Sequence, residues 1–260
     1  MIDVNIREHG ITLLHLDETL VKQRLLLDFP HEWIDCSDIG HSQGYCETCS
    51  LNRIRKRLAK RHYKKVTLIG NGNYHYISFL LMSEVEEPFS LVLFDHHADM
   101  LESNNAPMIT CGSWVSYSLQ KLPLLKKVLI IGVNDVDPAF SHKNVPSNVS
   151  FITEKDIRSL SIKTIEKRMN AFLDGDPIYL SIDKDVLYRE DAFTNWDQGS
   201  MSLLQLIFLL RQINQKKKVI GLDVCGELPI SPVELFSLNQ AAQIKKNEIA
   251  NRAILDILNS

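Results

Sequence analysis

Two short segments of the sequence place acidic and imidazole side chains at every second position. The first contains Asp95, His97 and Asp99, and the second contains Asp183 and Asp185. Alternate residues of an extended chain face the same side, so each segment is expected to direct its ionisable groups together. Buried carboxylates without partners repel one another strongly, and bound cations remove that repulsion. The two segments therefore predict a metal site.

A further ligand is expected from His75, which lies in the loop after another apolar run. The combined set offers four carboxylates and two imidazoles but no thiolate, which favours Mn²⁺ over a structural zinc ion. Two divalent cations balance four carboxylates, and together they make hydroxide available near neutral pH by lowering the pKa of a shared water. The predicted metal ligands are His75, Asp95, His97, Asp99, Asp183 and Asp185.

Short apolar runs of the kind that form buried strands precede these groups. Seven runs are continuous rather than alternating, as expected for strands of a parallel sheet covered on both faces. Helical patterns lie between them, which predicts an α/β fold with right-handed crossovers. The runs span residues 11–16, 66–70, 90–94, 127–133, 149–152, 177–182 and 219–224, with a weaker candidate at 31–36. The helical patterns span residues 53–65, 154–172, 202–215 and 232–258.

Polar segments rich in Asp and His follow five of the runs. In open α/β sheets, ligands bind at the carboxyl ends of the strands. Loops are polar in general, which would explain one or two such endings. It explains poorly five endings that are all rich in Asp and His. The five segments read NGNYHY, DHHAD, NDVD, DKD and CGE.

Length and composition limit the classes of protein that fit. The 260 residues show no internal repeat or low-complexity linker, so we expect a single domain over residues 1–260. A net charge of −3 argues against nucleic acid as a partner. The first residues lack the layout of a signal peptide, and no apolar run approaches the roughly 18 residues that span a bilayer. These features favour a cytoplasmic protein that does not enter membranes.

The five cysteines are too few and too scattered for a disulfide scaffold. Cys46 and Cys49 form one C-x-x-C pair with Cys36 nearby, and His41 is the obvious fourth residue for a zinc site. Reduced thiols without metal or redox chemistry are the favoured interpretation of this group.

In their order along the chain, the three ligand segments resemble motifs of the arginase–agmatinase family of ureohydrolases. The family's G-G-D-H, D-A-H-x-D and S-x-D-x-D motifs correspond to residues 72–75, 95–99 and 181–185. Residues 131–138 and 221–227 look like two further family motifs. The resemblance covers most of the chain from about Val66 onward, and residues 1–62 form a divergent N-terminal part.

The resemblance implies a single-domain three-layer sandwich with a mostly parallel central sheet and a binuclear manganese site. One Mn²⁺ ion would be held by His75, Asp95, Asp99 and Asp183. The other would be held by Asp95, His97, Asp183 and Asp185, so that Asp95 and Asp183 bridge the two ions.

The resemblance also implies hydrolysis of a linear C–N bond, with a metal-bridging hydroxide attacking the carbon of a small guanidino or amidine substrate. Asp99 would orient the hydroxide and help move its proton to the leaving amine. Glu227 would pair with the guanidinium group, and Asp135 and Asp137 would meet a substrate amine. Cys111 stands where the family has a histidine suited to proton transfer. Family members also suggest a homo-oligomer, a trimer or a hexamer.

Several positions depart from the family pattern and keep alternatives open. Met100 and Leu101 follow the second motif in place of the family's Ile-Asn, and Glu227 lies one residue late, so that Gly226 takes its position. One alternative is a metal-binding protein of the same fold that has lost catalysis. Another is a deacetylase-like amide hydrolase with a single zinc ion.

Overall fold

All seven predicted apolar runs form strands of one central sheet, and the weaker run forms a strand at its edge. The computed structural model describes residues 10–102, 108–137, 145–173, 175–230 and 237–258. Each described pairing within the eight-stranded sheet is parallel. In spatial order the strands are β2 (His31–Asp35), β1 (Ile11–His15), β4 (Val66–Leu68), β10 (Val219–Cys225), β9 (Ile178–Asp183), β5 (Phe89–Phe94), β7 (Leu125–Val133) and β8 (Val149–Thr153).

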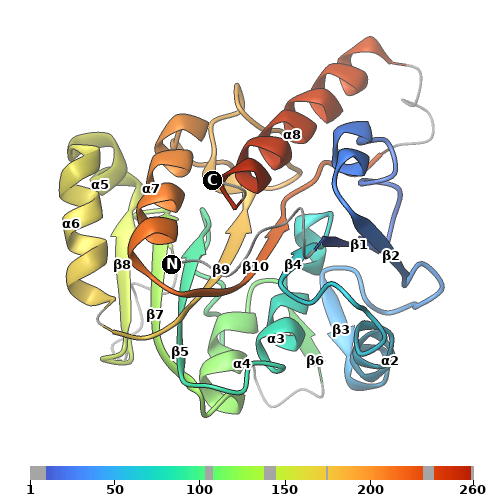
Figure 1. Cartoon of the computed structure of the whole chain (residues 1–260), viewed down its shortest axis with the longest axis horizontal. Helices are drawn as coiled ribbons and strands as arrows, with labels where there is room; N and C mark the ends of the chain where they lie inside the picture. Colours follow the sequence, from blue (N-terminus) through green and yellow to red (C-terminus); the bar gives the residue numbers. More distant parts are fainter. Residues whose placement is uncertain (1–9, 103–107, 138–144, 174, 231–236, 259–260) are drawn as a thin grey trace.

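The sheet separates two apolar cores, as a three-layer sandwich requires. In β5, Val92 and Phe94 face one core, while Leu91 and Leu93 face the other. All four side chains are buried, and burial of each contributes about 1.5–3 kcal/mol to folding. Figure 1 shows the helices on the two sides of the sheet. The first core includes α6 (Ile162–Phe172), α7 (Leu203–Lys216) and α8 (Leu238–Ile257), and the second includes α2 (Thr48–Leu58), α3 (Ile77–Met82) and α4 (Trp114–Lys121).

The predicted helices are present, with altered boundaries. The pattern at 154–172 forms two helices, α5 (Glu154–Ser159) and α6, because Leu160 is extended and the Ser161 side chain caps α6 by accepting from the Thr164 amide. The pattern at 53–65 ends at Leu58 and begins earlier, at Thr48. Residues 232–236 of the last predicted helix lie outside the described residues.

A small second sheet was not predicted. β3 (Tyr45–Glu47) pairs antiparallel with β6 (Met108–Thr110), and three residues are too short to give a periodic pattern. The pairing holds the divergent N-terminal part against the chain that follows the ligand segment of residues 95–99. This contact between residues distant in sequence builds one side of the pocket described below.

The strand order explains why polar residues collect after five runs. β4, β10, β9, β5 and β7 are consecutive neighbours in the sheet, so their carboxyl ends lie side by side. The five polar endings therefore meet at one edge, as expected for a ligand site of an open α/β sheet.

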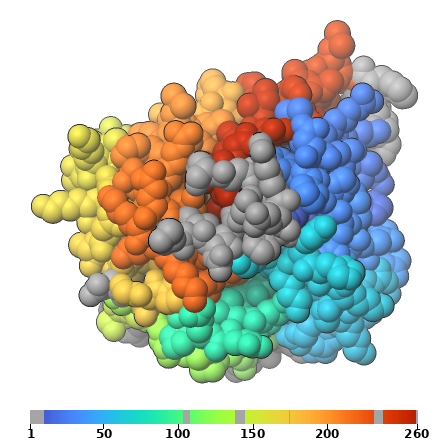
Figure 2. Space-filling model, viewed as in Figure 1, coloured from blue at the N-terminus to red at the C-terminus, as the bar shows by residue number. Residues whose placement is uncertain are grey.

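The last helix binds segments from the start of the chain. The Leu25 amide, in the short 3₁₀ helix η1 (Arg24–Asp28), donates to Glu248 of α8 at 2.6 Å, and Arg252 pairs with Asp28 at 2.8 Å. Figure 2 shows the blue N-terminal and red C-terminal parts of the chain adjoining. Among the described helices, none combines the length and the apolar character needed to cross a bilayer.

Candidate metal centre

The ligand segment of residues 95–99 converges through a turn and not through strand alternation. β5 ends at Phe94, so Asp95, His97 and Asp99 lie beyond the extended chain. The Asp95 carboxylate accepts from the His97 amide at 2.7 Å, which closes a tight turn, and Asp99 has a positive φ of 50°. Asp and Asn tolerate this left-handed conformation better than most residues. The sequence-based reason for convergence is therefore corrected, although the three side chains do converge.

The ligand segment of residues 183–185 also converges through a turn and not through strand alternation. Asp183 ends β9, and its carboxylate caps the short 3₁₀ helix η4 (Lys184–Val186) by accepting from the Asp185 amide at 2.9 Å. Asp185 in turn accepts from the His96 amide at 3.0 Å, and its other oxygen lies 2.9 Å from Nδ1 of His97. Lys184, between these two carboxylates in sequence, faces away from them and pairs with Glu227.

His75 is fixed in one tautomer by a buried chain of hydrogen bonds. Asp223 accepts from the hydroxyls of Ser181 at 2.7 Å, Ser78 at 2.9 Å and Tyr179 at 2.9 Å. Since the Ser181 hydroxyl donates to Asp223, it accepts at 2.9 Å from Nε2 of His75. In the neutral ring the proton is therefore on Nε2, which leaves the Nδ1 lone pair for a metal ion.

Nδ1 of His75 faces three carboxylates. It lies 3.3 Å from an oxygen of Asp95, 3.3 Å from Asp99 and 3.6 Å from Asp183. Ligands about 2.0–2.3 Å from a shared ion are separated from one another by roughly 3.0–3.6 Å, the spacing seen here. The donor set and its spacing therefore fit a divalent cation at this position.

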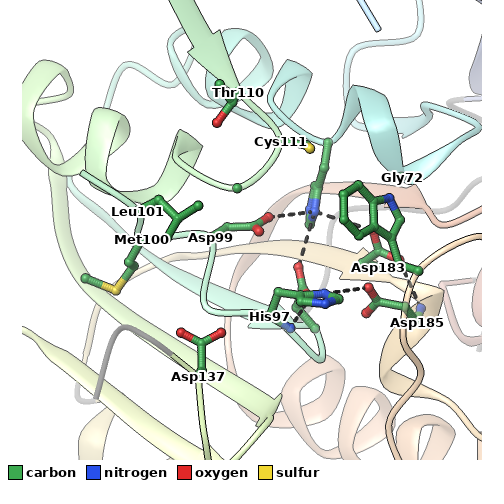
Figure 3. Close-up of a pocket in the computed structure, with 14 residues that line it drawn as sticks. Gly72, His97, Asp99, Met100, Leu101, Thr110, Cys111, Asp137, Asp183 and Asp185 are labelled. Carbon is green, nitrogen blue, oxygen red and sulfur yellow. Dashed lines mark hydrogen bonds and ion pairs between the residues drawn. The ribbon is translucent and has the colours of Figure 1, made fainter. Parts of the chain in front are cut away.

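A second group of ligand atoms adjoins the first. Oxygens of Asp95 and Asp185 and a nitrogen of His97 lie within 4.8 Å of one another. Asp95 belongs to both groups, as a bridging ligand would. Figure 3 shows His97, Asp99, Asp183 and Asp185 around one shared space. The six predicted ligands are thus brought together from three separate loops.

Burial makes this cluster costly in the absence of cations. It raises the pKa of Asp99, and burial with the neighbouring Asp185 raises the pKa of Asp183. Burial and the charge of Asp95 raise the pKa of Asp185 to about 6. Burial lowers the pKa of His97, but hydrogen bonds to Asp185 and Asp95 outweigh it and raise the value to about 12. Without a cation, bound protons therefore offset the negative charge of the buried carboxylates. A cation that binds here would displace those protons.

A cavity of about 370 Å³ opens over the cluster (Figure 3). Its wall includes the predicted ligands together with apolar and small residues. Asp137 lies in the wall and accepts from the Ala98 amide at 3.0 Å. Besides the predicted ligands, the lining residues are Gly72, Met100, Leu101, Thr110, Cys111, Gly112, Asp137 and Trp196.

Two tryptophans lie close to the ligand cluster, one in the cavity wall and one in the core. Trp196 lines the cavity, and Trp114 is fully buried and donates from Nε1 to the Asp99 carboxylate at 2.6 Å. Cys111 is also in the wall, and burial, reinforced by Asp99, raises the pKa of its thiol to about 12. A neutral thiol is a weak proton carrier at this position.

Two residues predicted to contact substrate lie elsewhere. Asp135 accepts from the Lys155 amide at 2.9 Å and is absent from the cavity wall. Glu227 is buried on the far side of the ligand loop, where its carboxylate pairs with Lys184. Gly226, with a φ of +84°, redirects the chain after β10 and so delivers Glu227 to that partner. The geometry favours a structural role for both carboxylates.

The cysteine group of the N-terminal part forms no metal cluster in the described structure. Cys36 and Cys46 are buried and Cys49 is exposed, all as free thiols. The three clusters of suitable ligand atoms found among the described residues each include residues of the cavity wall.

Sequence reasoning missed two parts of the centre. Asp223 and Ser181 fix His75, and Cys225 places its sulfur 3.1 Å from an oxygen of Asp183. Asp223 lies near the end of the predicted run 219–224 and Cys225 directly follows it, and that position was the available signal.

Comparison of the sequence with models of known families identifies the class of protein to which this fold and site belong. The model of the arginase family matches residues 6–237, so this chain belongs to the arginase family. An uncharacterized protein from Thermotoga maritima is 32% identical over 179 residues, which span 69% of this chain and 64% of that protein.

Solved structures share the fold at low sequence identity. Arginase from Bacillus cereus superposes with a TM-score of 0.71 at 13% identity, covering 96% of this chain and 98% of that one. A hypothetical agmatinase from Burkholderia thailandensis gives a TM-score of 0.69 at 17% identity, covering 95% and 84%. The three-layer, mostly parallel α/β architecture is confirmed by these superpositions.

Proposed function

We propose that this protein is a binuclear metal-dependent hydrolase that cleaves a linear C–N bond in a small guanidino or amidine compound. The observation that supports the proposal most directly is the meeting of four carboxylates and two imidazoles at the floor of a cavity. Membership of the arginase family supports the reaction class. We assign one ion to His75, Asp95, Asp99 and Asp183.

The second ion would be held by Asp95, His97, Asp183 and Asp185, so that Asp95 and Asp183 would serve both ions. When bound, two divalent cations supply positive charge and lower the pKa of water enough to provide a nucleophile near neutral pH. The six oxygen and imidazole donors suit Mn²⁺, so hydrolysis is tested with this ion.

The residues of the chain perform the remaining steps. Asp99 lies in the cavity wall with one oxygen held by Trp114, so its carboxylate can take a proton at a fixed place and deliver it to the leaving amine. Asp137 is an acidic side chain of the wall outside the ligand set, and we assign it to a cationic group of the substrate. Met100, Leu101 and Trp196 limit the access of water to the reacting carbon.

The test is hydrolysis by purified protein loaded with Mn²⁺. Arginine, agmatine, guanidinobutyrate, guanidinopropionate and formiminoglutamate are incubated separately, and urea or formamide is measured. Asp183→Asn should lose both metal and turnover. Asp176→Asn is the matched control, because Asp176 precedes β9 at the opposite edge of the sheet and accepts from Ser90.

Metal content measured by elemental analysis separates the competing functions. Close to two ions per chain with product from the panel supports the proposal, and close to one ion favours the deacetylase-like alternative. Two ions with no product from any of these substrates would remove the ureohydrolase function. That outcome favours a metal-binding protein without this activity, for which the pairing of Glu227 with Lys184 is the supporting observation.

A further inference from the structure

Cys225 is a buried thiol in contact with the ligand cluster. It is the last residue of β10, its side chain is fully buried, and its Sγ lies 3.1 Å from Oδ2 of Asp183. The sulfur, a ring nitrogen of His75 and the Asp183 oxygen lie within 4.8 Å of one another. This is a third group of metal-ligating atoms, and two of its members are already assigned to one ion.

The sheet itself sets this position. Cys225 and Asp183 are register partners in the neighbouring parallel strands β10 and β9, so their side chains project from the same face. Gly226 then turns the chain with a φ of +84°. A Cβ at Gly226 would lie 2.4 Å from Oδ1 of Asp183, so the close approach of the two strand ends depends on this glycine.

The thiol differs from the other buried cysteines of the described chain. Cys36 and Cys46 belong to the apolar core beside the N-terminal part, and neither belongs to a described ligand cluster. Cys225 also reaches that core, but its sulfur donates to a carboxylate that faces the cavity. A Sγ···O separation of 3.1 Å is within the roughly 3.1–3.6 Å expected of a sulfur and an oxygen bound to the same ion.

We propose that Cys225 is a thiolate ligand of the ion held by His75 and Asp183. This inference rests on the proposed metal centre and adds a ligand that the six oxygen and nitrogen donors do not include. On binding, the S–H proton is released to solvent, and the sulfur and the Asp183 oxygen that it now touches both coordinate the cation. No electron is transferred in this step.

A thiolate changes the metal preference of the centre. The expectation of Mn²⁺ relied on a ligand set without sulfur, and a soft thiolate favours Zn²⁺, Co²⁺ or Fe²⁺ at that position. The two ion positions are then unequal. The position of Asp95, His97 and Asp185 keeps oxygen and imidazole ligands alone and stays suited to Mn²⁺.

Cobalt provides the direct test, because a Co²⁺–thiolate bond has a sulfur-to-metal charge-transfer band in the near ultraviolet. Metal-free wild-type protein, Cys225→Ser, Cys111→Ser and Cys49→Ser are each titrated with Co²⁺, and the absorption spectrum and the bound cobalt are measured. We expect the band in the wild type and in the variants at Cys111 and Cys49, and its loss in Cys225→Ser. X-ray absorption of the wild type should show sulfur at about 2.3 Å from the metal.

The outcomes separate this inference from the proposed function. Cobalt bound by the wild type without a charge-transfer band or a sulfur neighbour overturns the role of Cys225 and leaves the metal centre in place. A band that survives Cys225→Ser, or disappears in Cys111→Ser instead, also overturns it. Failure of the folded wild type to bind any cobalt removes the proposed metal centre as a whole.

Competition between metals gives a second readout. Cys225→Ser should lower the affinity for Zn²⁺ by more than about tenfold. Mutating a residue that only orients a metal ligand already costs about tenfold or more, and loss of a ligand should cost more than that. Its affinity for Mn²⁺ should change much less. An equal loss for both ions would indicate structural damage instead of a lost thiolate and would count against the proposal.

Discussion

Lys184 and Glu227 form a fully buried ion pair beside the carboxylates of Asp183 and Asp185. Lys184 stands between Asp183 and Asp185 in sequence, and its ammonium group also donates to Asn251 of α8 at 2.9 Å. Glu227 accepts from Asn251 at 2.7 Å and from Asn247 at 3.0 Å. The pair thereby links the loop that carries two ligands to the C-terminal helix.

Removing one member of this pair should destabilise the protein strongly. Lys184→Met leaves the Glu227 carboxylate buried without its cation, which typically costs about 3–5 kcal/mol of unfolding free energy. The double variant Lys184→Met with Glu227→Gln should recover a large part of that loss, since no buried charge remains unpaired. Chemical denaturation followed by circular dichroism measures all three proteins. If Lys184→Met were as stable as the wild type, the ion pair would not be buried in the folded protein.

Gly226, the residue after β10, should be required for two reasons: its backbone has a positive φ, and there is no room for a side chain beside it. Gly226→Ala would place a Cβ 2.6 Å from the Lys184 amide nitrogen and closer still to the Asp183 carboxylate. Gly175→Ala is the control, because Gly175 has a similar φ of +78° but a Cβ added there would have no neighbouring atom within 4 Å. Both variants carry backbone strain of about 1–3 kcal/mol.

Only the change at Gly226 should also lower metal affinity, because only that Cβ displaces a ligand. Thermal denaturation and isothermal titration with Mn²⁺ give the two measurements. Equal effects of Gly226→Ala and Gly175→Ala on metal binding would contradict the steric explanation.

The indole of Trp114 should hold the Asp99 carboxylate in place, to which we assign proton transfer. Its Nε1 donates to Asp99 at 2.6 Å, and Phe keeps most of the packing but removes that donor. Trp114→Phe should reduce metal affinity or turnover by about 10–100-fold, as is usual for residues that orient a ligand. Trp33→Phe, at a partly exposed position on the edge strand β2, should leave both values unchanged. Full metal affinity and full turnover in Trp114→Phe would argue against this role.

Metal binding should strengthen as the pH rises from about 5 to about 8, because each cation competes with protons. Asp185, with a pKa of about 6, carries a proton below that value, and His97, with a pKa of about 12, carries one throughout this range when no cation is bound. A ligand set that must lose protons binds more weakly at low pH. Calorimetry in buffers of different ionisation enthalpy counts the protons released, and an affinity that does not vary with pH would exclude this competition.

The sequence alone predicted the class of the fold, which the structure confirms, and named the acidic and imidazole residues that meet at the cavity. Continuous apolar runs predict buried parallel strands because both of their faces must be covered, and this is a local property of each segment. The polar endings of five runs also predict a ligand site, since parallel strands share one carboxyl edge. All six predicted ligands are therefore found together, although the turn after β5 brings Asp95, His97 and Asp99 into position, where strand alternation was expected.

Tertiary structure decided which further side chains reach that edge. The register of β10 against β9 places Cys225 beside Asp183, and the bend at Gly226 directs Glu227 to Lys184 and not to the cavity. Asp223 likewise reaches Ser181 and Tyr179 across neighbouring strands. These contacts join residues far apart in the chain. They depend on strand order and register, which are fixed only when the whole sheet packs, because no local segment encodes its partner.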